Sequence, residues 1–259
     1  MFRSRVTPRT AVLPAAALAL AATGLVATPA NAQTSASVAA DWDGQMIMYM
    51  AGEGQVNDLY VTSMGPGQTE GTRRIGFNDE HPIALGEHCS YIDPSDDTFA
   101  VCELPETSEM PDEIHVFLGD GDDGLFTSDP GVSAVHGGAG NDELHAHTAH
   151  MVMGDEGDDM LMGGIVMEGG DGMDHIMGDN RDQELTGGRG DDMIEAWDGV
   201  DIIYGNSGDD HVTAGKGNDF VSGGPDDDTI YGNSGDDTIL GGGGTDTLSG
   251  GPGTDDVTQ

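Results

Sequence analysis

Three consecutive stretches decide the fold: GGRGDDMIE at residues 187–195, AWDGVDIIY at 196–204 and GNSGDDHVT at 205–213. They are copies of one nine-residue unit, and ten such units follow one another without a gap from residue 169 to residue 258. Positions 1, 2 and 4 of the unit are mostly Gly, position 6 is Asp in nine of the ten units, and position 8 is always aliphatic. A short fixed period of this kind predicts a solenoid built from one repeated structural unit.

The composition of the unit predicts its local structure. A single aliphatic residue flanked by polar ones predicts a short strand with one buried face. The Gly-rich first six residues predict a turn, because Gly accepts positive φ angles. Two units then complete one coil, and the strands of units n and n+2 stack about 4.8 Å apart in a parallel sheet. We therefore expect an all-β fold, a parallel β-roll.

The same stacking brings the position-6 carboxylates together. At about 4.8 Å two such charges repel by about 3.5 kcal/mol at an effective dielectric constant of 20, and by about 1 kcal/mol in full contact with water. A divalent cation between neighbouring turns would reverse this cost. Carboxylate and carbonyl oxygens suit Ca²⁺ better than Mg²⁺, and the absence of Cys or His from the repeated positions argues against Zn²⁺ or Cu²⁺.

The pattern G-G-x-G-x-D-x-U-x resembles the calcium-binding nonapeptide repeat of the RTX (repeats-in-toxin, hemolysin-type) family. This resemblance implies a β-roll that holds several Ca²⁺ ions between turns n and n+2, with position-6 Asp side chains and carbonyls of the Gly-rich turn as ligands. It covers about half of the chain. It implies no toxin, protease or lipase activity, because such activities belong to attached domains.

Further copies lie before the array, out of register with it. GGAGNDELH at 137–145 and GDEGDDMLM at 154–162 both fit the pattern, and LGDGDDGLF at 118–126 is an eroded copy with Asp123 at position 6. The spacing slips between these copies, which predicts a bulge in the coil. Inside the array, Arg181 and Gln183 replace the Gly and the Asp of unit 178–186, where we expect a missing or weak site. Asp226 replaces the position-4 Gly of unit 223–231.

The residues expected to form the metal sites share positions 6 and 4 of their units. The predicted carboxylate ligands are Asp142, Asp159, Asp174, Asp192, Asp201, Asp210, Asp219, Asp228, Asp237, Asp246 and Asp255. The predicted loop glycines are Gly140, Gly157, Gly172, Gly190, Gly199, Gly208, Gly217, Gly235, Gly244 and Gly253.

The N-terminus has the pattern of a secretory signal peptide. Arg3, Arg5 and Arg9 precede the apolar stretch 11–26, and Ala-Asn-Ala at 30–32 is a cleavage pattern. We expect residues 1–32 to be removed and the protein to be secreted. The remaining chain has five basic and 48 acidic residues, a net charge of −43. This charge excludes nucleic-acid binding by counterion release, and the chain has no basic face for a membrane.

Residues 33–111 are expected to form an N-terminal β-rich cap or a degenerate start of the coil. Short β-like runs occur at 45–50, 59–64, 82–85 and 98–104. Cys89 and Cys102, the two cysteines of the chain, are expected to form a disulfide. Free thiols are the alternative. Residues 112–168 then hold the irregular repeats and residues 169–258 the regular array.

We expect no catalytic residues. H-E-x-x-H and G-x-S-x-G are both absent, and in HAHTAH at 145–150 an Ala replaces the Asp that a metallohydrolase motif requires. The main hypothesis is a secreted calcium-binding protein that folds on binding roughly five to ten ions. The first alternative is an extracellular adhesion or structural protein that self-associates through an uncapped C-terminal coil. A hydrolase with its site in the N-terminal region ranks lowest.

Overall fold

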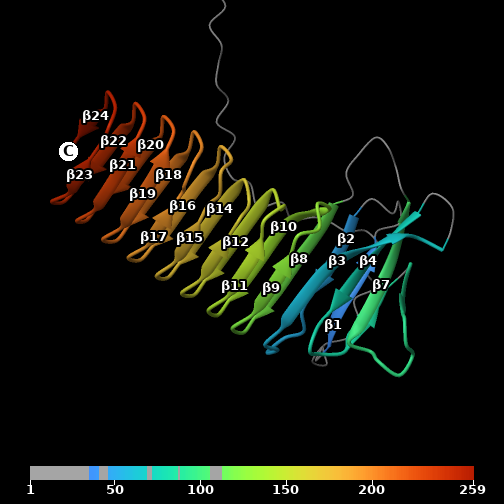
Figure 1. Cartoon of the computed structure of the whole chain (residues 1–259). Helices are drawn as coiled ribbons and strands as arrows, with labels where there is room; N and C mark the ends of the chain where they lie inside the picture. The colour runs from blue at the N-terminus through green and yellow to red at the C-terminus, as the bar shows by residue number, and fades with distance from the viewer. Residues whose placement is uncertain (1–34, 41–45, 69–71, 87, 106–112) are drawn as a thin grey trace, which may run out of the picture. The chain divides into compact units, whose positions relative to one another are not determined.

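The structure is a computed structural model that describes residues 35–40, 46–68, 72–86, 88–105 and 113–259. The predicted signal peptide, 1–32, lies outside the described residues. The described residues form two twelve-stranded sheets, A and B, and no helix (Figure 1). A search of these residues finds no helix with the length and hydropathy of a membrane span. The predicted all-β, parallel β-roll is confirmed.

The strands are divided equally between the two sheets, and they alternate between the sheets along the chain from β8 onward. Sheet A contains β1 (Ala36–Ala40), β2 (Met46–Met50), β5 (Ile83–Leu85), β8 (Glu113–Asp120), β10 (Val132–Ala139), β12 (Met151–Glu156), β14 (Val166–Asp171), β16 (Glu184–Arg189), β18 (Ile202–Ser207), β20 (Phe220–Gly224), β22 (Thr238–Gly242) and β24 (Asp256–Thr258). Sheet B contains β3 (Asp58–Pro66), β4 (Thr72–Asn78), β6 (Cys89–Tyr91), β7 (Phe99–Pro105), β9 (Gly124–Thr127), β11 (Glu143–Ala146), β13 (Met160–Met162), β15 (His175–Met177), β17 (Met193–Glu195), β19 (His211–Lys216), β21 (Thr229–Ser234) and β23 (Thr247–Ser249).

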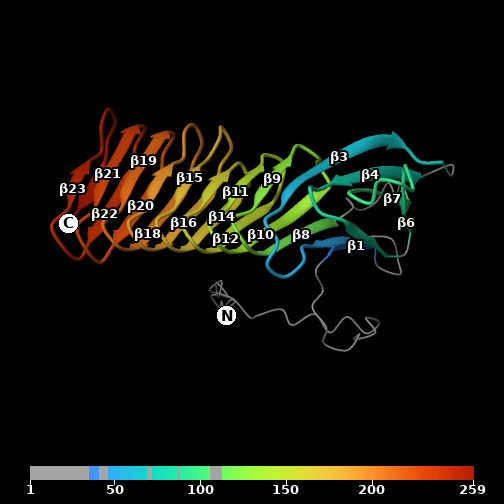
Figure 2. The same cartoon turned by 90° about the horizontal axis from the view of Figure 1, so that it is seen from below.

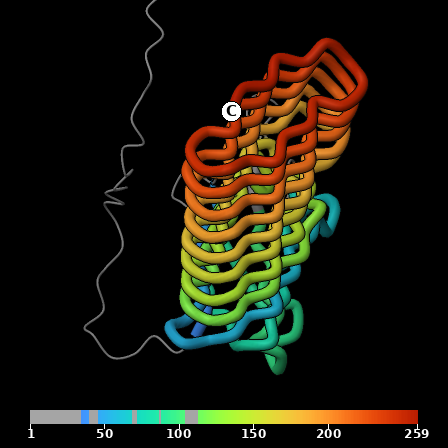
Figure 3. The backbone as a smooth tube through the Cα atoms, turned by 90° about the vertical axis from the view of Figure 1, so that its left-hand side faces the viewer, coloured from blue at the N-terminus to red at the C-terminus, as the bar shows by residue number. Residues whose placement is uncertain are grey.

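From β8 onward every coil contributes one strand to each sheet, and neighbouring coils pair in parallel (Figure 3). In sheet A, Leu185 lies opposite Ile203, which lies opposite Val221. These position-8 side chains are fully buried between the sheets. The core is therefore one row of aliphatic side chains from each sheet, each contributing about 1.5–3 kcal/mol by burial.

The N-terminal region combines the two predicted alternatives. Strands β2 and β3 pair in parallel with β8 and β9, so they form the first coil of the roll. Strands β1, β4, β6 and β7 extend the two sheets with antiparallel pairs (Figure 2). A disulfide joins Cys89 of β6 to Cys102 of β7, which confirms the expected pairing.

The irregular spacing of the early repeats is absorbed by one set of turns. The connection from β11 to β12 is only His147–His150, and that from β13 to β14 is only residues 163–165. The two connections that follow on the same edge, 178–183 and 196–201, are six residues long. On the other edge the connections are three residues long from β8–β9 to β18–β19, as at 140–142 and 157–159, and four residues long at 225–228 and 243–246. The repeats at 137–145 and 154–162 therefore stack in register on that edge, although they are out of register in the sequence.

Candidate metal centre

The turns that join the two sheets lie on two edges of the roll. We call the turns that lead from sheet A to sheet B the A-to-B edge, and those that return the B-to-A edge. The end-on view shows the turns of each edge stacked above one another (Figure 3). All position-6 residues lie at the ends of these turns, directly before a strand.

On the A-to-B edge the position-6 carboxylates form one continuous ladder. The backbone N–H of Asp174 donates to Oδ1 of Asp192 on the next coil, and the N–H of Asp192 donates to Oδ1 of Asp210, both at 2.9 Å. The same bond recurs at the other steps of this edge at 2.8–3.1 Å. The ladder consists of Asp123, Asp142, Asp159, Asp174, Asp192, Asp210, Asp228 and Asp246.

On the B-to-A edge the corresponding ladder is shorter. The N–H of Asp201 donates to Oδ1 of Asp219 at 2.9 Å, and the N–H of Asp219 donates to Oδ1 of Asp237 at 3.0 Å. The ladder ends with Asp255, whose Oδ1 accepts the N–H of Asp237. The structure thus brings every predicted Asp into one of two ladders.

One oxygen of each internal ladder carboxylate remains unsatisfied. These side chains are 1–3% exposed, yet their Oδ2 atoms have no hydrogen-bond partner in the described part of the chain. A buried acceptor without a partner costs about 1–3 kcal/mol, and more when it is charged. Ten carboxylates share this feature: Asp123, Asp142, Asp159, Asp174, Asp192, Asp201, Asp210, Asp219, Asp228 and Asp237.

A second oxygen converges on the unsatisfied one. A Cβ atom placed on Gly187, at position 1, would lie 2.3 Å from Oδ2 of Asp192 and 2.8 Å from the carbonyl oxygen of Gly205 on the next coil. The pair Asp174 and Gly187 gives the same arrangement around Gly169. A carboxylate oxygen and a carbonyl oxygen thus border one small space between coils. Such oxygens are the ligands that Ca²⁺ accepts in flexible geometry.

Burial of the ladder raises its carboxyl pKa values. The pKa of Asp192 and of Asp210 rises to about 7, and that of Asp174 to about 6. Burial is the largest cause, the accepted backbone N–H partly opposes it, and neighbouring carboxylates add to it for Asp192 and Asp210. The sequence alone indicated that repulsion between stacked charges is what makes the ionised carboxylates unfavourable in the folded state. In the structure, loss of hydration is the larger cause.

A second ladder, which the sequence analysis missed, lies beside the first at position 5. The N–H of Asp209 donates to Oδ1 of Asp191 on the preceding coil, and the N–H of Asp227 donates to Oδ1 of Asp209, both at 2.9 Å. These bonds run opposite to those of the position-6 ladder, and their side chains are exposed. The Asp-Asp pairs of the repeats are the sequence signal for this ladder, because each pair contributes to both.

The loop glycines are required by the stacking itself. At Gly190 a Cβ atom would lie 1.9 Å from the carbonyl oxygen of Gly172 on the preceding coil, and φ is +120°. All ten predicted loop glycines lie over the position-4 carbonyl of the coil before them in this way. Their role in the structure is therefore to let the coils approach closely.

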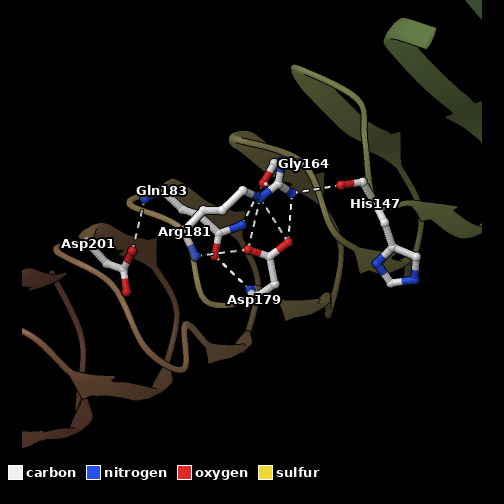
Figure 4. Close-up of polar contacts among 6 residues, drawn as sticks. All are labelled: His147, Gly164, Asp179, Arg181, Gln183 and Asp201. Carbon is white, nitrogen blue, oxygen red and sulfur yellow. Dashed lines mark hydrogen bonds and ion pairs between the residues drawn. The ribbon is translucent and has the colours of Figure 1, made fainter. Parts of the chain in front are cut away.

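Unit 178–186 closes its own site with protein atoms, as shown in Figure 4. The amide Nε2 of Gln183 donates to the carbonyl oxygen of Gly164 at 2.5 Å, and its Oε1 accepts the N–H of Asp179. The guanidinium of Arg181 contacts both carboxylate oxygens of Asp179 and donates to the carbonyl oxygen of His147 at 2.8 Å. We call Asp179, Arg181 and Gln183 the Arg181 clasp. In this unit the Gln183 amide and the Arg181 guanidinium donate hydrogen bonds to carbonyl oxygens. The other internal units have an unsatisfied Oδ2 atom at position 6.

The first coil carries the weakest version of the repeat. Asn57 lies at its position 6 and donates through its backbone N–H and its Nδ2 to Oδ1 of Asp123. The sequence analysis did not identify this coil, because Asn57 and Gln55 replace the expected Asp and Gly. In the described residues no group of three His, Cys, Asp or Glu side chains is arranged to hold a metal ion.

Comparison with protein families agrees with this geometry. The model of the RTX calcium-binding nonapeptide repeat matches the chain in four copies, at residues 133–148, 168–203, 198–230 and 222–257. The search of curated proteins gave no match, and neither did the search of solved structures. The matched stretches contain all the predicted Asp ligands except Asp159. Asp159 lies in the ladder of the A-to-B edge, between Asp142 and Asp174. The repeat array of this chain belongs to the RTX calcium-binding nonapeptide repeat family and folds as its β-roll.

Proposed function

We propose that this is a secreted calcium-binding protein whose β-roll folds when several Ca²⁺ ions bind between successive turns. The observation that supports this most is the set of ten buried Oδ2 atoms without a partner. The predicted Asp residues, together with Asp123, would be the carboxylate ligands. Carbonyl oxygens of the position-1 residues, such as that of Gly205, would complete the sites. The bound cation would offset the desolvation of the carboxylates.

Folding and binding are coupled in this proposal. The two oxygens around Gly187 belong to different coils, so they are far apart in an unfolded chain. Binding free energy then becomes folding free energy. Extracellular modules bind Ca²⁺ with dissociation constants of about 10⁻⁴–10⁻³ M. The chain would stay unfolded at cytosolic calcium levels and fold after export.

The disulfide supports the proposed location. Cys89 and Cys102 are bonded in the structure, and disulfides persist mainly in oxidising compartments. This agrees with the signal-peptide pattern of residues 1–32.

A non-catalytic role is part of the proposal. An RTX β-roll is a structural calcium-binding domain, and the region before it is short for an independent catalytic domain. Self-association through the last coil stays a prediction. Sedimentation of the calcium-loaded protein at several concentrations tests it, and a single monomeric species at all concentrations would contradict it.

Calorimetric titration of the demetallated protein with Ca²⁺ tests the proposal. We expect a cooperative transition that takes up about ten ions, one for each unsatisfied Oδ2. A transition with one or two ions would contradict the ladder as the binding site. Titration with Mg²⁺ is the control, and it should produce no folding at equal concentration, since Mg²⁺ demands octahedral geometry and keeps its water.

A further inference from the structure

The outer face of sheet B carries sulfur and imidazole groups that the calcium sites do not use. Met160, His175 and Met193 occupy position 7 on β13, β15 and β17. In register, Met160 lies opposite His175, and His175 lies opposite Met193. The imidazole of His175 is therefore flanked on adjacent strands by two thioether side chains.

These methionines are not part of the core. Met160 is 36% exposed and Met193 is 43% exposed, whereas the next residues, Leu161 and Ile194, are fully buried. Met167 is the contrasting case, since it is fully buried between the sheets. The exposed parts of Met160 and Met193, the outer members of this Met–His–Met row, therefore lie outside the core between the sheets.

His175 has an unsatisfied group within this row. Its Nε2 atom is buried and has no hydrogen-bond partner in the described structure. A buried polar nitrogen without a partner costs free energy. The two residues opposite His175 on the adjacent strands, Met160 and Met193, offer only thioether sulfur. A cation that accepts both nitrogen and sulfur ligands would satisfy all three groups.

We propose that Met160, His175 and Met193 form a site for a soft monovalent cation of the Cu(I) or Ag(I) class. Thioether sulfur selects such cations, and imidazole is a common partner ligand. Ca²⁺ takes oxygen ligands, so the two kinds of site do not compete. Each residue of the row directly follows a ladder Asp, but the methionines are exposed on the sheet face whereas the ladder carboxylates are buried, and the proposal does not depend on the calcium function.

Silver(I) is the probe for this site, because it does not change oxidation state in air. The calcium-loaded full chain is labelled with ¹³C at the methionine methyl groups and titrated with silver nitrate in chloride-free buffer. Up to one equivalent, we expect the methyl resonances of Met160 and Met193 to shift before that of Met167. If Met160 and Met193 do not shift before the other methionines, the proposal is wrong. Zn²⁺ should leave these methyl resonances unchanged.

Variants separate the ligands from the fold. We expect His175→Thr to weaken Ag(I) binding at this site by more than the roughly 10–100-fold that loss of an outer-shell partner costs, with unchanged calcium uptake and circular dichroism. Thr already occupies this position at Thr229 and Thr247 on later strands. The double variant Met160→Leu/Met193→Leu keeps side-chain volume but should lose the site, whereas Met167→Leu should retain it. Wild-type affinity in His175→Thr would overturn the proposal, and the methyl shifts of the wild type decide the question if a variant fails to fold.

Discussion

The two edges of the roll are built from the same repeat but differ in completeness. The A-to-B edge carries Asp at position 6 in every coil from Asp123 to Asp246, although the spacing between successive residues varies from 15 to 19. The B-to-A edge begins its Asp ladder only at Asp201, after two short turns and the Arg181 clasp. One edge thus preserves the ligand pattern while the other absorbs changes in length.

The edges also differ at position 1. The A-to-B edge has Gly at this position in each unit from 137 onward, whereas Ala196 and Ala214 introduce methyl groups on the B-to-A edge. The Cβ position at Gly187 lies within 2.3 Å of Oδ2 of Asp192. An alanine methyl therefore occupies space that the carboxylate oxygen borders. We expect the A-to-B edge to hold the larger number of calcium sites and the stronger ones.

Acidification should have the largest effect, because it acts on both edges at once. The folded-state pKa values of Asp192 and Asp174, about 7 and about 6, lie above the ordinary value of 3.8 for an Asp carboxyl group. Folding therefore favours the protonated form of these carboxyl groups. The stability that their protonation gives to the folded state is complete below about pH 3.8 and is lost as the pH rises through 6–7. In chelator, circular dichroism should show β-structure appearing as the pH falls from 8 to 4. Constant unfolded spectra over this range would contradict the burial argument.

A single isosteric substitution should stabilise the metal-free protein and destabilise the calcium-loaded protein. In Asp192→Asn a carboxamide NH₂ group can take the place of Oδ2, beside the space that the carbonyl oxygen of Gly205 borders. We expect the metal-free protein to gain about 1–3 kcal/mol, because a buried unsatisfied acceptor is removed. The calcium-loaded protein should bind fewer ions and melt at a lower temperature.

The neighbouring variant Asp191→Asn is the control for this experiment. It removes the same charge, but Asp191 is exposed and uses Oδ1 to accept the N–H of Asp209. Calorimetry should give the wild-type number of ions for Asp191→Asn. Equal losses in the two variants would mean that total charge, and not the buried oxygen, governs binding.

Restoring the consensus at the clasp should make the edges more alike. In Arg181→Gly/Gln183→Asp the donors to His147 and Gly164 are replaced by a ladder carboxylate. We expect about one additional bound ion by calorimetry. The metal-free protein should lose stability, since the clasp holds its turn without metal. An unchanged ion count would show that the short turns before it prevent the site.

Exchanges at position 1 should leave the number of bound ions unchanged and alter only the strength of the sites, because they leave the carboxylates in place. Gly187→Ala places a methyl group 2.3 Å from Oδ2 of Asp192, and we expect it to cost about 1–3 kcal/mol in the calcium-loaded protein. Ala196→Gly removes the corresponding methyl group on the other edge and should tighten the site at Asp201, with a change within about 1 kcal/mol. Thermal unfolding at a fixed calcium concentration measures both. Stability changes of equal size in the two variants would contradict the proposed difference in site strength between the two edges.

The period of the sequence predicted the strands, the buried position-8 row and the Asp ladders, because each depends on residues nine or eighteen positions apart. The coil at Asn57 was not predictable, since two signature residues are replaced there. The in-register stacking of Asp142 and Asp159 depends on how short the turns at 147–150 and 163–165 can be, which only the three-dimensional path determines. The replacements in unit 178–186 predict a missing or weak site there, but they do not predict the Arg181 clasp. Its donors, Gln183 and Arg181, reach the carbonyl oxygens of Gly164 and His147, which lie 19 and 34 residues earlier in the chain.

The most direct test is the far-UV circular dichroism of the fully demetallated full chain at pH 7.5, before and after addition of millimolar Ca²⁺. The account predicts a largely unfolded spectrum without calcium and a β-spectrum after its addition, because ten buried carboxylate oxygens lack a partner until a cation binds. A β-spectrum that is the same in chelator and in calcium would contradict it.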